Sequence, residues 1–244
     1  NIIEEDYIKL IDVLHKEKCE IDSQKSLTIS ELNDYYTLWV HQIKTPISAI
    51  KLLFKSKGIN DIELEQQLFK IEQYAEMALQ YIRSESDTTD FVIREYSLDA
   101  IIRQAIRKYS KLFILKKISL NYTPTDAVVI TDEKWLLFVI EQILSNSLKY
   151  TQKGTISIYM DDRYDLTLII EDTGKGIEPE DIPRIFEKGY TGYAGRIDKK
   201  STGIGLYLSK KILSRLSHKI RIYSVPDKGT KVLIDLSYSD KISE

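Results

Sequence analysis

Apolar residues recur in steps of three and four along the first third of the chain, and this spacing constrains its fold most strongly. One run extends over residues 36–54 and a second over residues 64–82. Such spacing gathers the apolar side chains on one stripe of an α-helix. Gly58 and Asn60 separate the two runs, and Asp61 is suited to cap the second helix. The sequence therefore predicts two antiparallel helices joined by a short loop.

The predicted hairpin, residues 29–87, has more apolar surface than two helices can cover. A second copy of the chain would cover the remaining side, so we expect a homodimer with a four-helix bundle. Residues 1–28 carry a similar seam that fades near residues 22–25. We expect this segment to be a coiled-coil or linker helix.

The pattern changes after the acidic stretch 84–90, and residues 88–244 mix short strand-like runs with helical ones. We expect helices over 98–115, 132–150 and 205–216, and strands over 118–122, 128–131, 155–160, 166–171, 220–224 and 231–236. Mixed helices with a mostly antiparallel sheet indicate an α+β fold, an α/β sandwich in which helices pack on a sheet.

Composition excludes several classes of protein. The chain has 244 residues, of which 43% are apolar and 30% charged, as in a folded soluble domain. Its formal net charge of -2 gives no general attraction to nucleic acid. The longest clean apolar run, 135–140, is too short to cross a bilayer. The single cysteine, Cys19, favours a reducing compartment. We expect no zinc site, because the sequence has no zinc-binding motif. The first residue, Asn1, suggests a fragment of a longer protein.

Two polar patterns in the second half could contact a phosphorylated ligand. Gln142, Asn146 and Lys149 share one face of the helix predicted over 132–150. An amide oxygen can ligate Mg²⁺, and an ammonium group can contact phosphate, although a polar outer stripe of a half-buried helix has the same spacing. Gly203 and Gly205 lie at the start of another predicted helix, whose N-terminal N–H groups could bind phosphate oxygens. A flexible helix start without a ligand has the same sequence pattern.

A third pattern, Asp172-Thr-Gly174-Lys-Gly176, follows a predicted strand. A carboxylate in this position can accept a hydrogen bond from an adenine amino group, and the glycines allow close backbone approach. A tight turn after a strand, with no ligand, can have the same sequence.

Taken in chain order, at 142–149, 172–176 and 203–205, the three patterns resemble the N, G1 and G2 boxes of the ATPase family that includes histidine kinases, DNA gyrase and MutL. Ile185-Phe186 stands where histidine kinases carry the F box. The resemblance implies a Bergerat-type ATP-binding domain with ATP and Mg²⁺ as cofactors. The nucleotide-binding residues it implies are Gln142, Asn146, Lys149, Tyr150, Asp172, Gly174, Gly176, Ile177, Lys188, Thr202, Gly203, Gly205, Leu206 and Thr230.

Roles follow from the same resemblance. Asn146 would hold Mg²⁺, Lys149 would touch phosphate, Tyr150 would pack on adenine, and Asp172 would read the adenine amino group, with Thr230 nearby. Residues 188–201 would form a mobile lid. The chain departs from the pattern at Gln142, where asparagine is usual, which puts direct metal contact by residue 142 in doubt. It departs again at Gly189, where a second F-box aromatic is common, which suggests a looser lid.

The first half contains a candidate phosphoacceptor, His41, beside the apolar seam and therefore facing solvent. A helical histidine is usually an ordinary surface residue, but Pro46 lies inside the same seam, where a proline costs about 3 kcal/mol and should kink the helix. The segment His41-Gln42-Ile-Lys-Thr45-Pro46 resembles the H box of histidine kinases. The resemblance implies His41, Gln42 and Thr45 as catalytic residues, with Thr45 serving dephosphorylation.

The form of this H box looks like that of the intramembrane-sensing kinases that work with peptide-exporting ABC transporters. It implies a cytoplasmic fragment of a protein anchored in the bacterial cell membrane, in which residues 1–28 transmit the signal. The expected activity is autophosphorylation of His41 from MgATP and transfer to an aspartate of a response regulator. A related ATPase or protein-serine kinase, or a non-catalytic nucleotide-binding dimer scaffold, remains as an alternative.

Overall fold

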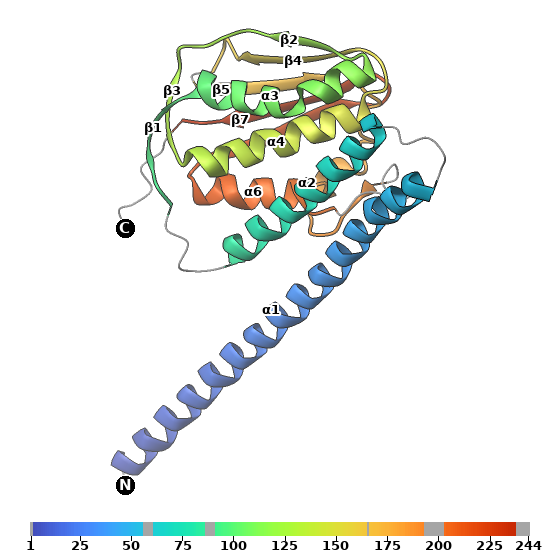
Figure 1. Ribbon diagram of the computed structural model, residues 1–244. Helices are drawn as coiled ribbons and strands as arrows, with labels where there is room; N and C mark the ends of the chain where they lie inside the picture. The colour runs from blue at the N-terminus through green and yellow to red at the C-terminus, as the bar shows by residue number, and fades with distance from the viewer. Residues whose placement is uncertain (1, 56–60, 86–90, 165, 193–202, 238–244) are drawn as a thin grey trace. The chain divides into compact units, whose positions relative to one another are not determined.

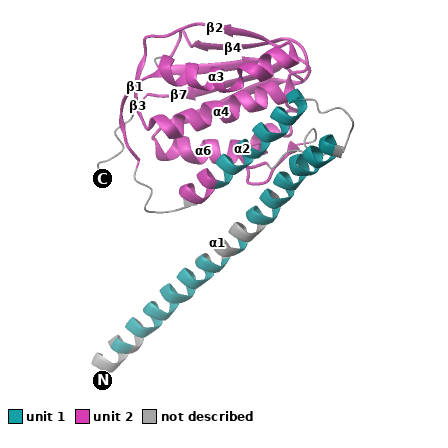
Figure 2. Cartoon of the chain, viewed as in Figure 1, with its two compact units in different colours: residues 1–78 teal, residues 79–244 magenta. Residues whose placement is uncertain are grey.

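The computed structural model describes residues 2–55, 61–85, 91–164, 166–192 and 203–237 (Figure 1). The chain divides into two compact units, Asn1–Ala78 and Leu79–Glu244 (Figure 2).

The first unit contains two helices. Helix α1 spans Ile2–Lys55, and helix α2 spans Asp61–Glu85 and continues into the second unit. The indole Nε1 of Trp39 donates a hydrogen bond of 2.8 Å to the carbonyl of Tyr74, which joins the two helices. The predicted helices are therefore confirmed. The fading seam near residues 22–25 does not end a helix, because α1 runs on without interruption through Pro46.

Much of the predicted apolar seam is open to solvent in the single chain. The exposed fractions are 43% for Val40, 37% for Ile47 and 61% for Phe54 on α1, and 48% for Leu68 on α2. Among the described helices, none has the length and low charge that a bilayer-crossing segment needs.

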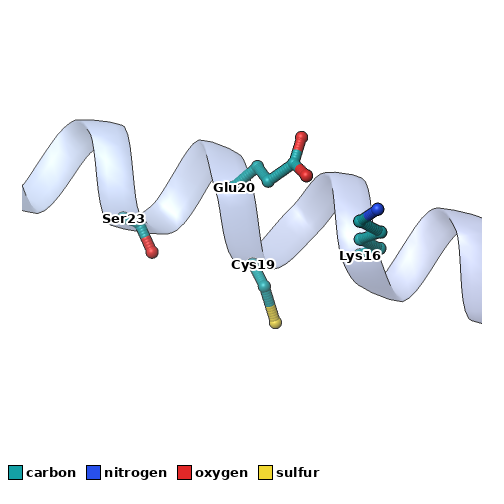
Figure 3. A pocket seen from close by; sticks show the side chains of 4 residues that line it. All are labelled: Lys16, Cys19, Glu20 and Ser23. Atoms are coloured by element: carbon teal, nitrogen blue, oxygen red, sulfur yellow. The ribbon is translucent and has the colours of Figure 1, made fainter.

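A shallow hollow of about 400 Å³ lies on α1, where Lys16, Cys19, Glu20 and Ser23 line it (Figure 3). All four side chains come from one exposed helix. The described residues contain no cluster of three or more metal-binding side chains, there or elsewhere.

The second unit is built on a five-stranded sheet in the order β2-β4-β5-β7-β6, with a separate β1-β3 pair. The strands are β1 Arg94–Ser97, β2 Ser119–Tyr122, β3 Val128–Thr131, β4 Thr155–Met160, β5 Thr167–Asp172, β6 Lys219–Val225 and β7 Gly229–Asp235. All pairs are antiparallel except β2 with β4, which is parallel. The expected mostly antiparallel sheet is confirmed.

Helices α3 (Leu98–Lys116), α4 (Glu133–Tyr150) and α6 (Gly205–Arg215) cover one face of this sheet (Figure 1). A short 3₁₀ helix, η1, spans Ile182–Arg184. The core lies between the helices and the sheet, where Ile156, Ile158, Leu168 and Ile170 are fully buried. Alternate residues of each strand point to this face, so the intervening ones point to the opposite face of the sheet.

Candidate active site

Helix α4 carries the first group of predicted site residues. It begins after Asp132, whose carboxylate accepts hydrogen bonds from the backbone N–H groups of Lys134 and Trp135. Gln142 and Asn146 lie one turn apart, nearly buried and half-buried respectively. Neither side-chain amide has a hydrogen-bond partner in the part of the chain that the structure describes. Both amides therefore keep their oxygens available for a ligand.

Gln142 also faces the glycine-rich start of α6. Its side-chain oxygen lies 2.8 Å from the point where a Cβ of Gly205 would be. The structure thus brings together the N-box and G2-box positions, which are 63 residues apart in the sequence. The glycine at 205 leaves room for the Gln142 amide against the first turn of α6.

Asp172 ends strand β5 and is nearly buried, with 6% of its surface exposed. Its carboxylate accepts hydrogen bonds from the backbone N–H of Gly174, at 2.9 Å, and from the hydroxyl of Ser147, at 3.0 Å. Burial raises the pKa of Asp172, and these hydrogen bonds, with one from the Thr230 backbone, act in the opposite direction. Sequence reasoning missed Ser147, which holds this carboxylate in place.

The loop after Asp172 is fastened to the turn between β6 and β7. Gly176 has a φ of 71°, and a Cβ there would lie 2.1 Å from the Val225 carbonyl oxygen, so only glycine fits. The N–H of Ile177 donates to the Ser224 hydroxyl at 2.8 Å, and that hydroxyl lies 2.9 Å from the Thr230 hydroxyl. The structure therefore gathers the predicted G1 residues and Thr230 around Asp172.

Tyr150, at the end of α4, lies beside two cations. The Nζ of Lys149 is 5.0 Å from the Tyr150 ring centroid, and the Nζ of Lys175 is 4.8 Å from it. Both distances are within the range of a cation–π contact. The sequence indicated Lys149 and Tyr150 but not Lys175.

The described start of the predicted lid is held by several contacts. The N–H of Gly189 donates to the Gly203 carbonyl at 3.1 Å, and both glycines have positive φ, 75° and 65°. The Tyr190 hydroxyl donates to Asp181, and the Arg184 guanidinium lies 4.4 Å from the Tyr190 ring centroid. Tyr190 thus supplies an aromatic ring one position after Gly189.

Three further residues are predicted to bind nucleotide near the lid, namely Lys188, Thr202 and Leu206. The Nζ of Lys188 lies 5.3 Å from the Tyr81 ring centroid, at the end of α2 within the second unit. Thr202 and residues 193–201 of the lid predicted over 188–201 lie outside the described residues. Leu206 is half-buried in the first turn of α6.

The predicted phosphoacceptor segment lies on α1, in the first unit. His41 is exposed there, as its place beside the seam predicts. Gln42 is nearly buried, with 9% of its surface exposed. The Thr45 hydroxyl donates a 3.2 Å hydrogen bond to the His41 carbonyl one turn earlier, which is the local bond common for helical threonine.

Comparison with known proteins identifies the second unit. Residues 131–240 match the family described as histidine kinase-, DNA gyrase B-, and HSP90-like ATPase. This range contains the N, G1 and G2 positions gathered around Asp172 and Gly205. The match establishes ATP binding as the function of this domain.

Relatives of the whole chain identify its class. The chain is 33% identical over 236 residues to sensor histidine kinase YxdK of Bacillus subtilis, covering 93% of the chain and 70% of that protein. It is 34% identical over 245 residues to GraS of Staphylococcus aureus, with 98% and 69% covered. It is 30% identical over 236 residues to BceS of Halalkalibacterium halodurans, with 94% and 68% covered. The chain belongs to the sensor histidine kinase family and is an ATP-dependent histidine kinase.

Solved structures agree on the fold. Histidine kinase AdeS of Acinetobacter baumannii aligns with a TM-score of 0.55 at 18% identity, covering 81% of the chain and 98% of AdeS. The catalytic domain of histidine kinase ThkA aligns with a TM-score of 0.51 at 21% identity, covering 59% of the chain and 94% of that domain.

Membership of the sensor histidine kinase family implies a dimer and a response-regulator partner.

Proposed function

We propose that His41 is the phosphoacceptor of this kinase and that the site around Asp172, Asn146 and Gly205 binds the ATP that phosphorylates it. The observation that carries the proposal is the convergence of the N, G1 and G2 positions on one end of the sheet and the ends of α4 and α6. An exposed imidazole on a helix supplies the nucleophile.

The reaction is an in-line phosphoryl transfer. A neutral imidazole nitrogen of His41 forms a bond to the γ-phosphorus as the bond from that phosphorus to the β–γ bridging oxygen breaks. The electron pair leaves with ADP, and the imidazole proton passes to solvent. Gln42 can accept a hydrogen bond but is no base at neutral pH, so its role is to orient the ring. A second transfer moves the phosphoryl group to an aspartate carboxylate of the response regulator.

The α4 amides fit a hard cation. The Asn146 oxygen is uncommitted among the described residues, and amide oxygens are ligands that Mg²⁺ accepts. Bound Mg²⁺ would neutralise phosphate charge and hold the γ-phosphate in line. Asn146 would hold the ion, while Lys149 would reach the phosphates. Gln142 would face the nucleotide site from α4, beside the start of α6.

Asp172 suits an adenine amino group because fixed donors, namely the backbones of Gly174 and Thr230 and the Ser147 hydroxyl, already occupy part of its carboxylate. Gly174 and Ser147 hold the carboxylate in one orientation, so that a remaining lone pair can accept from the ligand. Tyr150 would pack on the base, and Thr230 lies on the neighbouring strand β7, in register with Asp172.

The exposed seam of the first unit would be covered in a homodimeric four-helix bundle. Thr45 would assist dephosphorylation of the regulator after releasing its bond to the His41 carbonyl. The form of the H box, His41-Gln42-Ile-Lys-Thr45-Pro46, supports a full-length protein that is anchored in the bacterial cell membrane and contributes to antimicrobial-peptide resistance with an ABC transporter.

Two matched variants test the proposal. His41→Ala should abolish phosphate incorporation while ATP affinity stays unchanged, because the nucleophile is not part of the nucleotide site. Asn146→Ala should abolish incorporation and remove the Mg²⁺ dependence of ATP binding. Normal autophosphorylation in Asn146→Ala would show that the metal site is placed wrongly.

A further inference from the structure

Lys175 lies between the two G1 glycines, and its backbone is fixed from both sides. Its N–H donates to the Tyr150 carbonyl at 3.3 Å, and its carbonyl accepts from the Asp227 N–H at 2.8 Å. The main chain of Lys175 therefore joins the end of α4 to the β6–β7 turn. Its side chain is exposed and turns over the Tyr150 ring, 4.8 Å from the centroid.

The charge of Lys175 is not balanced by a carboxylate. Within the described ranges, the Lys175 side chain takes part in no ion pair, and its ammonium group lies over the Tyr150 ring. A cation–π contact at an exposed position is weak compared with a contact to phosphate oxygens. A ligand with negative charge at this rim would therefore gain from the ammonium group without breaking a salt bridge.

Lys149 lies over the same ring, 5.0 Å from its centroid. Because both ammonium groups lie so close to one centroid, their separation is below about 10 Å, the Debye length at 0.1 M salt. Two like charges held this close repel each other, and an anion between or beside them relieves that repulsion. The pair thus makes a positive rim next to Asp172 that fits a polyphosphate better than a neutral ligand.

We propose that Lys175 is a further nucleotide-binding residue, whose ammonium group leaves the Tyr150 ring to contact the phosphate chain of ATP alongside Lys149. This inference rests on the proposed nucleotide site around Asp172 and Asn146. The interaction is electrostatic, so its strength should increase with the number of phosphates on the ligand.

The test is calorimetric titration of the full chain with adenosine, AMP, ADP and ATP in the presence of Mg²⁺. Lys175→Met should weaken ATP binding about three- to tenfold, ADP binding less, and adenosine binding by less than twofold. Lys175→Arg should retain ATP affinity because it keeps the charge. Raising the salt concentration should reduce the difference in ATP affinity between wild type and Lys175→Met, because salt screens the charge of Lys175.

Lys219→Met is the matched control for net charge. Lys219 is exposed at the other end of β6, opposite Asp235 rather than beside the Asp172 end of the sheet. This variant should bind all four ligands like wild type, and an equal loss of ATP affinity in it would overturn the proposal.

Two other results would overturn the role of Lys175. An unchanged ATP affinity in Lys175→Met would exclude phosphate contact. An equal loss for adenosine and ATP would mean that Lys175 only supports the Tyr150 ring. Failure of the nucleotide site itself would show differently, as ATP binding that is insensitive to Asn146→Ala and independent of Mg²⁺.

Discussion

At the scale of single residues, two hydroxyls near the G1 loop, those of Ser147 and Thr151, are in opposite situations. The Ser147 hydroxyl donates to the buried Asp172 carboxylate. The Thr151 hydroxyl is fully buried, yet it has no hydrogen-bond partner within the described structure. A buried hydroxyl without a partner lowers the free energy of unfolding, whereas a hydroxyl that donates to a carboxylate raises it.

Thr151→Val should therefore raise the free energy of unfolding of the nucleotide-free protein by about 1 kcal/mol, because valine has the same shape without the hydroxyl. Ser147→Ala is its control and should lower that free energy by about 1–3 kcal/mol, because a buried carboxylate loses a donor. Urea denaturation measures both. A loss of stability in Thr151→Val would mean that its hydroxyl has an acceptor in solution.

Some residues of the site could be proposed from the sequence, and others became apparent only in the structure. Asn146 and Asp172 could be proposed from the sequence because each belongs to a local pattern whose spacing has a chemical meaning. Ser147, Thr151 and Lys175 could not be assigned in this way. Their roles depend on contacts with Asp172 or the Tyr150 ring, which exist only once α4 and β5 have packed together.

At the scale of elements, the turn between β6 and β7 holds the G1 loop against β5. Gly229 opens β7 with a φ of 121°, and a Cβ there would lie 1.9 Å from the Asp172 carbonyl oxygen. That oxygen belongs to the backbone of the neighbouring strand and cannot move aside alone. Gly189 is a contrasting case, with a φ of 75° and no atom within 4 Å of its missing Cβ.

Gly229→Ala should accordingly destabilise the second unit by about 3 kcal/mol or more, since it combines backbone strain with a main-chain clash. Gly189→Ala should cost only about 1–2 kcal/mol, because its penalty is the left-handed conformation alone. Thermal unfolding of both variants measures the difference. Equal losses would show that the close contact at Gly229 does not restrict the fold.

Most elements could be predicted because periodicity reports which face is buried. The helices at 98–116 and 133–150 lie within one or two residues of their expected bounds, since Asp132 and the apolar spacing mark them locally. Strand β1 was missed because its four residues, Arg94–Ser97, are mostly exposed and show no apolar alternation. The parallel pairing of β2 with β4 was also missed, because strand direction depends on the path of the connecting chain.

At the scale of the whole molecule, pH should affect stability through one buried histidine. His218 is 3% exposed, and its Nε2 lies 3.1 Å from the Thr131 hydroxyl. Burial lowers the pKa of His218 from 6.5 to about 4, while the charge of Asp235 acts in the opposite direction. The unfolded chain therefore binds a proton more readily than the folded one between these two pH values, so stability is present above pH 6.5 and is lost toward pH 4.

The free energy of unfolding should accordingly fall by roughly 2 kcal/mol between pH 7.5 and pH 5 through this histidine. His218→Leu should remove most of that fall, whatever its stability at pH 7.5. Denaturation curves at several pH values compare the two proteins. The same pH slope in His218→Leu would assign the effect to other groups.

In the proposed reaction of the whole kinase, ATP bound in the second unit phosphorylates His41 of the first. The most direct measurement is incubation of the full chain with γ-labelled ATP and Mg²⁺, followed by acid and base treatment and by mapping of the labelled peptide. The account predicts a label that is lost in acid, survives base, maps to the peptide containing His41, and is absent from His41→Ala. An acid-stable label, or a label that persists in His41→Ala, would contradict it.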